Sequence, residues 1–371
     1  MREETNKRID MKAFFALLQM AVGTRDSFPE VPDSEQAWRG LLEVVAEHCL
    51  LGVTFPVIKK LHDQGIVPLE VLIPWGLVVD EIAKKNHLQR EAVGVLYQQF
   101  MKDGFRNCLL KGQASGNYYP NPLQRQSGDI DLWMEGGHKK VMAYLRPRYK
   151  VRKTRYIHCD AQVLKHHRVE IHFTPSWMFA PGANRRLQRW FASQADVQFS
   201  HFDPILGCAI PTTTFNAVYM MLHIYRHLLE EGIGLRQLLD YYYVLQHLTP
   251  EDRIAVLRDL QHLGLDSFAG AVMHVLREVF GLGEAQMLCP PNARRGALLL
   301  EAILESGNFG MADPLFAGKA RKEGIIAHGW RKFKRNLRFL QLCPSEVVWM
   351  PFFVTWQYFW RRKHGYLYKG R

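Results

Sequence analysis

The sequence of 371 residues lacks an uninterrupted hydrophobic run of the roughly 20 residues that a membrane-spanning helix needs. Its longest apolar stretch, residues 347–360, is interrupted by Pro351, Thr355 and Gln357. The first ten residues are polar, and no secretory signal peptide is visible after them. We therefore expect a cytoplasmic protein without a transmembrane segment.

Paired cysteine motifs are absent as well. A Cys-x-x-Cys pair is not found, and the six cysteines are spread over the chain at Cys49, Cys108, Cys159, Cys208, Cys289 and Cys343. This spacing fits neither a zinc ribbon nor a thioredoxin-like motif, and scattered reduced thiols are typical of the cytosol. We interpret these cysteines as small buried hydrophobic residues in an ordinary globular protein.

Residues 1–318 carry almost no net charge, because the positive charge is concentrated in the C-terminal segment, residues 319–371. The formal net charge is +12, but residues 319–371 hold 13 lysines and arginines against two acids, which gives +11 for this segment alone. The segment is also rich in aromatic residues between Trp349 and Trp360. Three alternatives stay open: the aromatics pack on the protein, or the segment contacts an anionic membrane surface or RNA. A membrane contact would place the protein at the periphery of the membrane.

Helical periodicity dominates both ends of the chain, and a short β-prone region separates them. Helices are predicted over 36–63, 74–103, 138–146, 212–231, 235–248, 250–263, 266–280, 292–305 and 319–341. Strands are predicted over 107–111, 129–134, 149–157, 159–165 and 167–173. We expect an α+β protein with four parts, namely a helical region (1–104), a compact core with a small mixed β-sheet (105–175), a helical domain (176–318) and the basic, aromatic segment (319–371).

The β-prone region carries three carboxylates in a suggestive pattern. Asp129 and Asp131 are two residues apart on a predicted strand, so both point to one face of the sheet. Glu170 alternates with the apolar Val169 and Ile171, which puts it on the polar side of another predicted strand. Like charges placed side by side repel each other, and a divalent cation removes that conflict. These carboxylates are therefore candidate metal ligands.

The segment before the aspartate pair fits a phosphate-binding role. An apolar strand ends in Lys111 and Gly112, and glycine allows the backbone to approach a ligand closely. A short helix after Gly112 would direct free N–H groups toward phosphate oxygens. Lys111 and Arg125 are candidate cationic partners of a triphosphate, with ordinary surface charge as the alternative.

The run LLKGQASGNYYPNPLQRQSGDIDLWM (residues 109–134), together with VEIHF (residues 169–173), resembles the bacterial family of uncharacterised nucleotidyltransferases, part of the DNA-polymerase-β-like superfamily. The resemblance places Gly112 at the superfamily glycine, Asp129 and Asp131 at the metal-binding pair, and Glu170 at the third carboxylate. It implies a nucleotidyltransferase core embedded between helical regions.

This resemblance implies a Mg²⁺-dependent enzyme, with Mn²⁺ as a substitute, that transfers a nucleoside monophosphate from an NTP and releases pyrophosphate. ATP is the expected donor. The acceptor stays open between a small molecule, a protein hydroxyl and RNA. Two departures from the superfamily pattern are Gln113 after the glycine and the longer gap to Asp129. They leave Gln113, Ser115 and backbone amides as alternative phosphate contacts.

Two further groups of residues raise alternatives. Four histidines (His158, His166, His167 and His172) surround Glu170, which keeps a metal-dependent hydrolase open, although His-x-x-x-His and His-Glu-x-x-His are absent there. We expect His172 to support Glu170 by a hydrogen bond. A catalytically inactive nucleotide-binding or regulatory module of the same fold is the other alternative.

The predicted helices after residue 212 repeat a spacing of one helical turn. His223 and His227 show it on one helix, and Arg236 and Asp240 show it on the next. The simplest interpretation is a helix hairpin with an internal Arg236–Asp240 pair. The family resemblance includes similar spacings, which implies that these four residues and His172 form a wall of the cleft.

Overall fold

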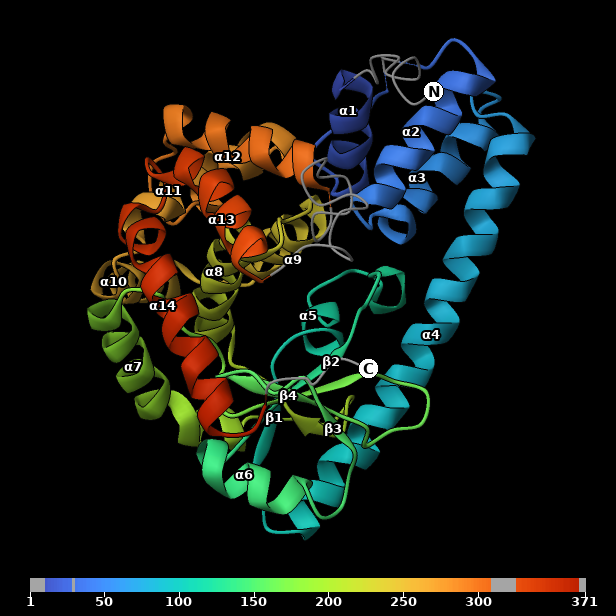
Figure 1. The fold of residues 1–371 in the computed structure, drawn as a ribbon. Helices are drawn as coiled ribbons and strands as arrows, with labels where there is room; N and C mark the ends of the chain where they lie inside the picture. Colours follow the sequence, from blue (N-terminus) through green and yellow to red (C-terminus); the bar gives the residue numbers. More distant parts are fainter. Residues whose placement is uncertain (1–10, 29–30, 308–324, 367–371) are drawn as a thin grey trace.

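The computed structural model describes residues 11–28, 31–307 and 325–366 (Figure 1). Four helices come first: α1 (Met11–Ala21), α2 (Glu35–Glu47), α3 (Leu51–Asp63) and α4 (Leu69–Lys102). The prediction of a single helix over 36–63 is therefore wrong, because the helix is interrupted between α2 and α3. Cys49 has φ +57° there, a left-handed conformation that a helix cannot continue through. Long α4 spans one side of the molecule from the N-terminal helices to the sheet (Figure 1).

The core is a mixed sheet of five strands in the order β1-β2-β5-β4-β3. The strands are β1 (Asn107–Leu109), β2 (Ile130–Met134), β3 (Val151–Arg152), β4 (His158–Ala161) and β5 (Val169–His172). β2 and β5 are parallel, and the other pairs are antiparallel. The α+β class and the small mixed sheet between helical regions are confirmed. Strands β3, β4 and β5 are shorter than predicted, because tight turns occupy the residues between them.

Alternation along β2 and β5 separates the core side of the sheet from the polar side. Ile130 and Leu132 on β2, and Val169 and Ile171 on β5, are all almost completely buried. Helix α6 (Gly137–Leu145) lies beneath the sheet in Figure 1. One face of the sheet is thus buried in the core, and the side chains that alternate with these apolar residues lie on the opposite face.

The chain after the sheet is helical, as predicted. The helices are α7 (Pro181–Ser200), α8 (Thr213–Glu230), α9 (Leu235–Gln246), α10 (Pro250–Leu263), α11 (Asp266–Phe280) and α12 (Ala293–Ser306). Thr212 is the N-cap of α8, where its hydroxyl accepts from the amide of Phe215 at 3.4 Å. Between α7 and α8 the short strands β6 (Phe202–Asp203) and β7 (Cys208–Ala209) form a hairpin that the sequence analysis missed.

The C-terminal segment forms α13 (Ile325–Asn336) and α14 (Pro344–Lys363). Residues 319–324 of the predicted helix lie outside the described residues. Glu346 of α14 is 1% exposed and accepts hydrogen bonds from the amides of Phe179 and Ala180 at the start of α7. One side of α14 therefore packs on the helical domain. Among the helices in the described ranges, none is both long and apolar enough to cross a bilayer.

Buried His48 links the α2–α3 junction to α9. Its Nδ1 accepts a hydrogen bond from the amide of Leu235 at 3.3 Å, which requires an unprotonated nitrogen. Burial lowers the pKa of His48 from 6.5 to about 4. In the unfolded chain His48 binds a proton as the pH falls below 6.5, whereas in the folded chain it stays unprotonated down to about pH 4. The unfolding free energy therefore decreases as the pH is lowered from 6.5 to about 4.

We predict that lowering the pH from 7.5 to 5 costs about 2 kcal/mol of unfolding free energy through His48 alone. His48→Asn keeps an acceptor near the same position but does not titrate. Urea unfolding of both proteins at the two pH values measures the difference. An identical pH dependence in the variant would contradict the assignment.

Candidate active site

Four carboxylates gather on the polar face of the sheet, where β2, β5 and β4 lie side by side. Asp131 is directly opposite Glu170 in the parallel β2–β5 register, and Glu170 is opposite Asp160 of β4. Asp129 immediately precedes β2. The expected neighbourhood of Glu170 and the aspartate pair is thus present, with Asp160 as a fourth acid that the sequence analysis missed.

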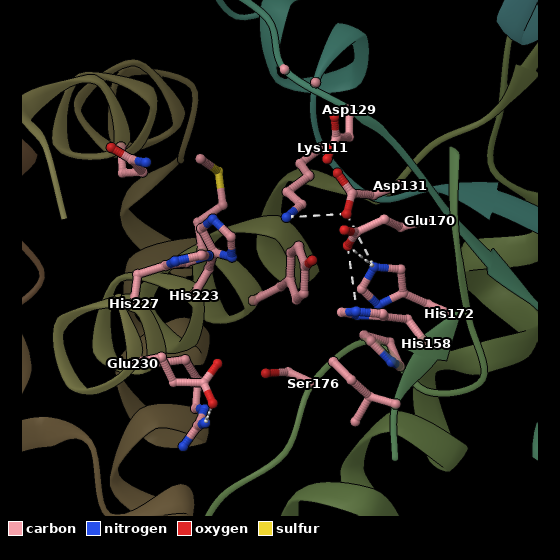
Figure 2. A pocket seen from close by; sticks show the side chains of 18 of the residues that line it. Lys111, Asp129, Asp131, His158, Glu170, His172, Ser176, His223, His227 and Glu230 are labelled. Atoms are coloured by element: carbon pink, nitrogen blue, oxygen red, sulfur yellow. Dashed lines mark hydrogen bonds and ion pairs between the residues drawn. The ribbon is translucent and has the colours of Figure 1, made fainter. Parts of the chain in front are cut away.

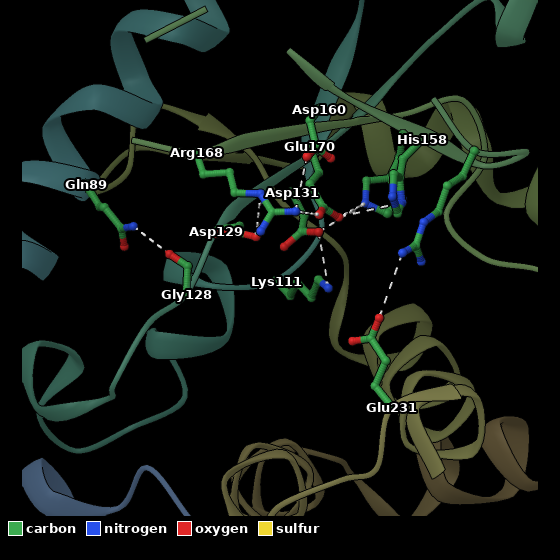
Figure 3. A network of polar contacts seen from close by, with 12 residues as sticks. Gln89, Lys111, Gly128, Asp129, Asp131, His158, Asp160, Arg168, Glu170 and Glu231 are labelled. Atoms are coloured by element: carbon green, nitrogen blue, oxygen red, sulfur yellow. Dashed lines mark hydrogen bonds and ion pairs between the residues drawn. The ribbon is translucent and has the colours of Figure 1, made fainter. Parts of the chain in front are cut away.

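Two cations partly balance this cluster (Figure 3). The Lys111 ammonium lies 3.1 Å from Asp131 Oδ1. The Arg168 guanidinium reaches three acids, at 3.4 Å from Asp129 and 3.2 Å from both Asp160 and Glu170. Four acids face two cations, so the cluster keeps an excess of negative charge.

The acids differ in their tendency to ionise. Burial would raise the pKa of Asp131, but Lys111 and the hydrogen bond with His172 outweigh it and hold this pKa well below its usual range. Burial raises the pKa of Glu170, and the charge of Asp131 adds to that effect. Burial also raises the pKa of Asp129, against the opposing charge of Arg168. Asp131 is therefore the firmly ionised member of the cluster.

Gly112 joins β1 to the short helix α5 (Gln113–Gly116) beside the carboxylates. Its φ of +69° is a conformation that other residues rarely adopt, and an added Cβ would lie 3.4 Å from the carbonyl oxygen of Asp129. Lys111 and Gly112 both line the cavity at this face. The positive φ therefore favours glycine at this turn, whereas an added Cβ would make only an ordinary van der Waals contact with Asp129.

Gln113 and Ser115 do not line the cavity. Both side chains are buried, and the Gln113 amide donates to Asn86 Oδ1 at 2.9 Å and to Gln89 Oε1 at 3.0 Å, both on α4. This arrangement does not support the phosphate contact suggested for the Gln113 and Ser115 side chains. Backbone amides at Gly112 are the remaining alternative.

The same two α4 side chains hold the loop that leads to Asp129. Asn86 donates to the carbonyl oxygens of Leu123 and Arg125, each at 2.7 Å, and Gln89 donates to that of Gly128 at 2.8 Å. The 3₁₀ turn η1 (Pro122–Gln124) lies in this loop. The long gap between the glycine and the aspartates is therefore a fixed structure attached to α4.

Arg125 and Asp240 form a buried pair between this loop and α9. The guanidinium donates through two nitrogens to the two carboxylate oxygens at 2.6 and 2.7 Å, and Tyr119 donates to the same carboxylate at 2.6 Å. The expected Arg236–Asp240 pair did not include Arg125, which is the hydrogen-bonded ion-pair partner of Asp240. Arg236 donates to the carbonyl oxygen of Gln126 at 2.6 Å. Arg125 thus fastens the loop, and its contact with a triphosphate stays a prediction.

The carboxylates form one wall of a cavity of about 510 Å³. The predicted wall residues His172, His223, His227, Arg236 and Asp240 all line this cavity. Figure 2 shows His223, His227 and Glu230 of α8 across the cavity from the acids of the sheet. A volume of this size is in the usual range for a small-ligand site.

His223 and His227 of α8 are held in neutral form. Burial, followed by the charge of Lys111, lowers the pKa of His227 to about 3 and also lowers that of His223. His172 Nε2 lies 3.0 Å from Asp131 Oδ1, so its hydrogen-bond partner is Asp131 and not Glu170 as expected. His158 and His172 are opposite each other on β4 and β5.

Several residues at or near the cavity were not predicted from the sequence, among them Asn86, Gln89, Asp160 and Arg168. Arg168 stands two residues before Glu170, and this alternation was a signal that it shares the acidic face. No comparable signal pointed to Asn86 and Gln89, because polar residues on a long helix are usually solvated.

We predict that Asp240→Asn lowers the unfolding free energy by about 3–5 kcal/mol, because it leaves the Arg125 charge buried without its counter-ion. The paired replacement Arg125→Met with Asp240→Leu removes both charges and should cost less than the single variant. Chemical unfolding of the three proteins gives the comparison. A double variant less stable than Asp240→Asn would argue against a buried ion pair.

Comparison with known proteins places the chain in a family. A solved structure described as an antigenic nucleotidyltransferase-like protein from Paracoccidioides brasiliensis is 13% identical, with 55% of this chain and 94% of that chain covered and a TM-score of 0.35, a likeness too weak to support an argument. No curated protein matches the chain. The family model described as "Uncharacterised nucleotidyltransferase" matches residues 34–281, which include the whole sheet and α8 and α9. The chain belongs to this family of uncharacterised nucleotidyltransferases, as the resemblance of residues 109–134 and 169–173 predicted.

Proposed function

We propose that the protein transfers a nucleoside monophosphate from an NTP to a hydroxyl or phosphate acceptor and releases pyrophosphate. Family membership supports nucleotidyl transfer in general terms. The observation that carries the finer proposal is the convergence of Asp129, Asp131 and Glu170 on one wall of a cavity of about 510 Å³. ATP is the proposed donor, and the acceptor class remains open.

The donor set of this wall suits Mg²⁺ or Mn²⁺. Hard divalent cations prefer carboxylate oxygens together with substrate phosphates and water. Arg168 lies within 3.4 Å of three acids, which identifies a place where these carboxylates attract positive charge. Asp129, Asp131 and Glu170 would hold the metal, which when bound neutralises phosphate charge and polarises the reacting phosphorus.

The chain itself supplies the remaining functions. The Lys111 ammonium, 22% exposed at the cavity wall, can bind a phosphate oxygen while it stays close to Asp131. The turn at Gly112 allows phosphate to approach the backbone. Glu170, whose pKa is raised by burial and by Asp131, is the better proton acceptor for an attacking hydroxyl.

The arrangement favours an active enzyme over an inactive nucleotide-binding module. All three carboxylates are present and line the same cavity. A module that only binds nucleotide does not need three acids, which repel phosphate in the absence of a cation. Incubation with each labelled NTP, with Mg²⁺ or Mn²⁺ and a cell extract, would reveal the donor and the acceptor from the position of the label.

We predict that Asp129→Asn lowers the rate of metal-dependent pyrophosphate release by at least about 100-fold, since it removes a charged ligand of the metal that would neutralise the reacting phosphates. Asp129 is partly exposed, and its replacement should leave the melting temperature almost unchanged. Asp196→Asn, an exposed acid on α7, is the matched control. Wild-type rates in Asp129→Asn would refute the proposed role.

We also propose that α14 attaches the protein to an anionic lipid surface. Its outer side exposes Trp349, Phe352 and Phe359, at 42%, 65% and 58% of their surface. Their spacing of three and seven residues places them on one stripe of the helix. Arg362 and Lys363 are exposed at its end. Aromatic side chains beside cations are typical of helices that lie on a membrane surface.

We predict that the triple variant Trp349→Ser, Phe352→Ser and Phe359→Ser loses flotation with phosphatidylserine vesicles. The matched control is Leu77→Ser, Val95→Ser and Ile254→Ser, which removes apolar residues of at least similar exposure from α4 and α10. Equal flotation of both triple variants would contradict the assignment, as would binding of the wild type to RNA but not to vesicles.

A further inference from the structure

A second group of potential ligands lies at the inner end of the carboxylate wall. His158 and His172 are cross-strand neighbours, and Glu170 lies on the same face two residues before His172. One ring nitrogen from each histidine and one oxygen of Glu170 lie within 4.8 Å of one another. Figure 2 shows these three side chains directed toward one place beside Asp131.

The individual contacts in this group are too long for direct hydrogen bonds. His158 Nδ1 lies 3.6 Å from Glu170 Oε2, and His172 Nε2 lies 3.9 Å from the same oxygen. His158 is 9% exposed, and its buried Nδ1 has no hydrogen-bond partner. A buried nitrogen in this situation usually has a reason, such as an ion that contacts it.

His172 offers a second buried nitrogen, because its Nδ1 has no hydrogen-bond partner. His172 Nε2 lies 3.0 Å from Asp131 Oδ1. A metal bound at Nε2 would replace this hydrogen bond, whereas a metal bound at Nδ1 would keep Asp131 as the carboxylate that orients the ring.

We propose that His158, His172 and Glu170 form a site for a divalent transition-metal ion adjoining the all-oxygen position at Asp129 and Asp131. Imidazole nitrogen favours ions such as Co²⁺, Cu²⁺ and Zn²⁺ over Mg²⁺, which prefers oxygen ligands. The cavity wall therefore offers two positions of different chemistry, and Glu170 belongs to both. The inference deepens the proposed function, on which it rests for the role of the neighbouring position.

The sequence shows four histidines near Glu170 but not which of them lie beside it in space. The histidines near Glu170 in the chain, His166 and His167, lie in the turn before β5 and do not take part. The ligand that completes the group comes from β4, twelve residues before Glu170, through antiparallel pairing. Motif spacing therefore argued against a metal, whereas the strand register brings the ligands together.

Binding of Co²⁺ to the purified full-length protein tests the proposal. We expect one Co²⁺ with visible absorption bands, bound in the presence of millimolar Mg²⁺. His158→Gln should raise the Kd for Co²⁺ at least about 100-fold, because it removes a direct ligand. His166→Gln, an exposed histidine in the nearby turn, is the matched control and should bind as the wild type does.

A measurement on the unaltered protein covers the case in which His158→Gln fails to fold. Pulsed electron paramagnetic resonance of bound Cu²⁺ should show coupling to histidine nitrogen. Absence of this coupling, or an unchanged Kd in folded His158→Gln, overturns the proposal. Asp129→Asn separates the two proposals, since it should abolish nucleotidyl transfer and keep Co²⁺ binding. Co²⁺ binding by a wild-type protein that transfers no nucleotide would refute the proposed function alone.

Discussion

Repulsion among four carboxylates on one face of a small sheet is the constraint on which the rest of this structure depends. Asp129, Asp131, Asp160 and Glu170 are brought together by strand register and not by any mutual attraction. Burial makes their proximity more unfavourable, as the raised pKa values of Asp129 and Glu170 show. The apolar residues on the opposite face provide the compensating stability, because they cannot be buried unless the acids occupy the other side.

The loop before β2 holds Asp129 close to the other acids despite their repulsion. Acids that repel each other move apart unless the backbone is fixed, and this loop is fixed from two directions. Asn86 and Gln89 of α4 bind its carbonyl groups, and the Arg125–Asp240 pair fastens it to α9. The Arg125–Asp240 pair is buried, so salt screens it less than it screens surface charges. The position of Asp129 is thus determined by α4 and α9, which hold the loop before it.

The sequence was sufficient for those parts of the fold and the site that local patterns encode. Alternation predicted the faces of β2 and β5, and the cap at Thr212 predicted the start of α8. Contacts between distant segments could not be predicted from the sequence. They are the contacts of Arg125 with Asp240, of Asn86 with the loop, and of His158 with His172. Such pairs depend on the register and on helix packing, which no spacing along the chain reveals. The site could be anticipated as a set of acids, but not as an arrangement with its supporting cations and amides.

The two walls of the cavity differ in their electrostatic character, and this difference bears on the acceptor. The sheet wall is negative apart from Lys111 and Arg168, and it attracts cations. The α8 wall presents His223 and His227 as neutral rings, because burial and Lys111 prevent their protonation. Neutral imidazoles add no attraction for the phosphates of a nucleotide, but each can donate and accept a hydrogen bond. Under the proposed function, this division would direct the charged donor to the sheet and leave the acceptor to the α8 wall, where Arg226 and Glu230 also line the cavity.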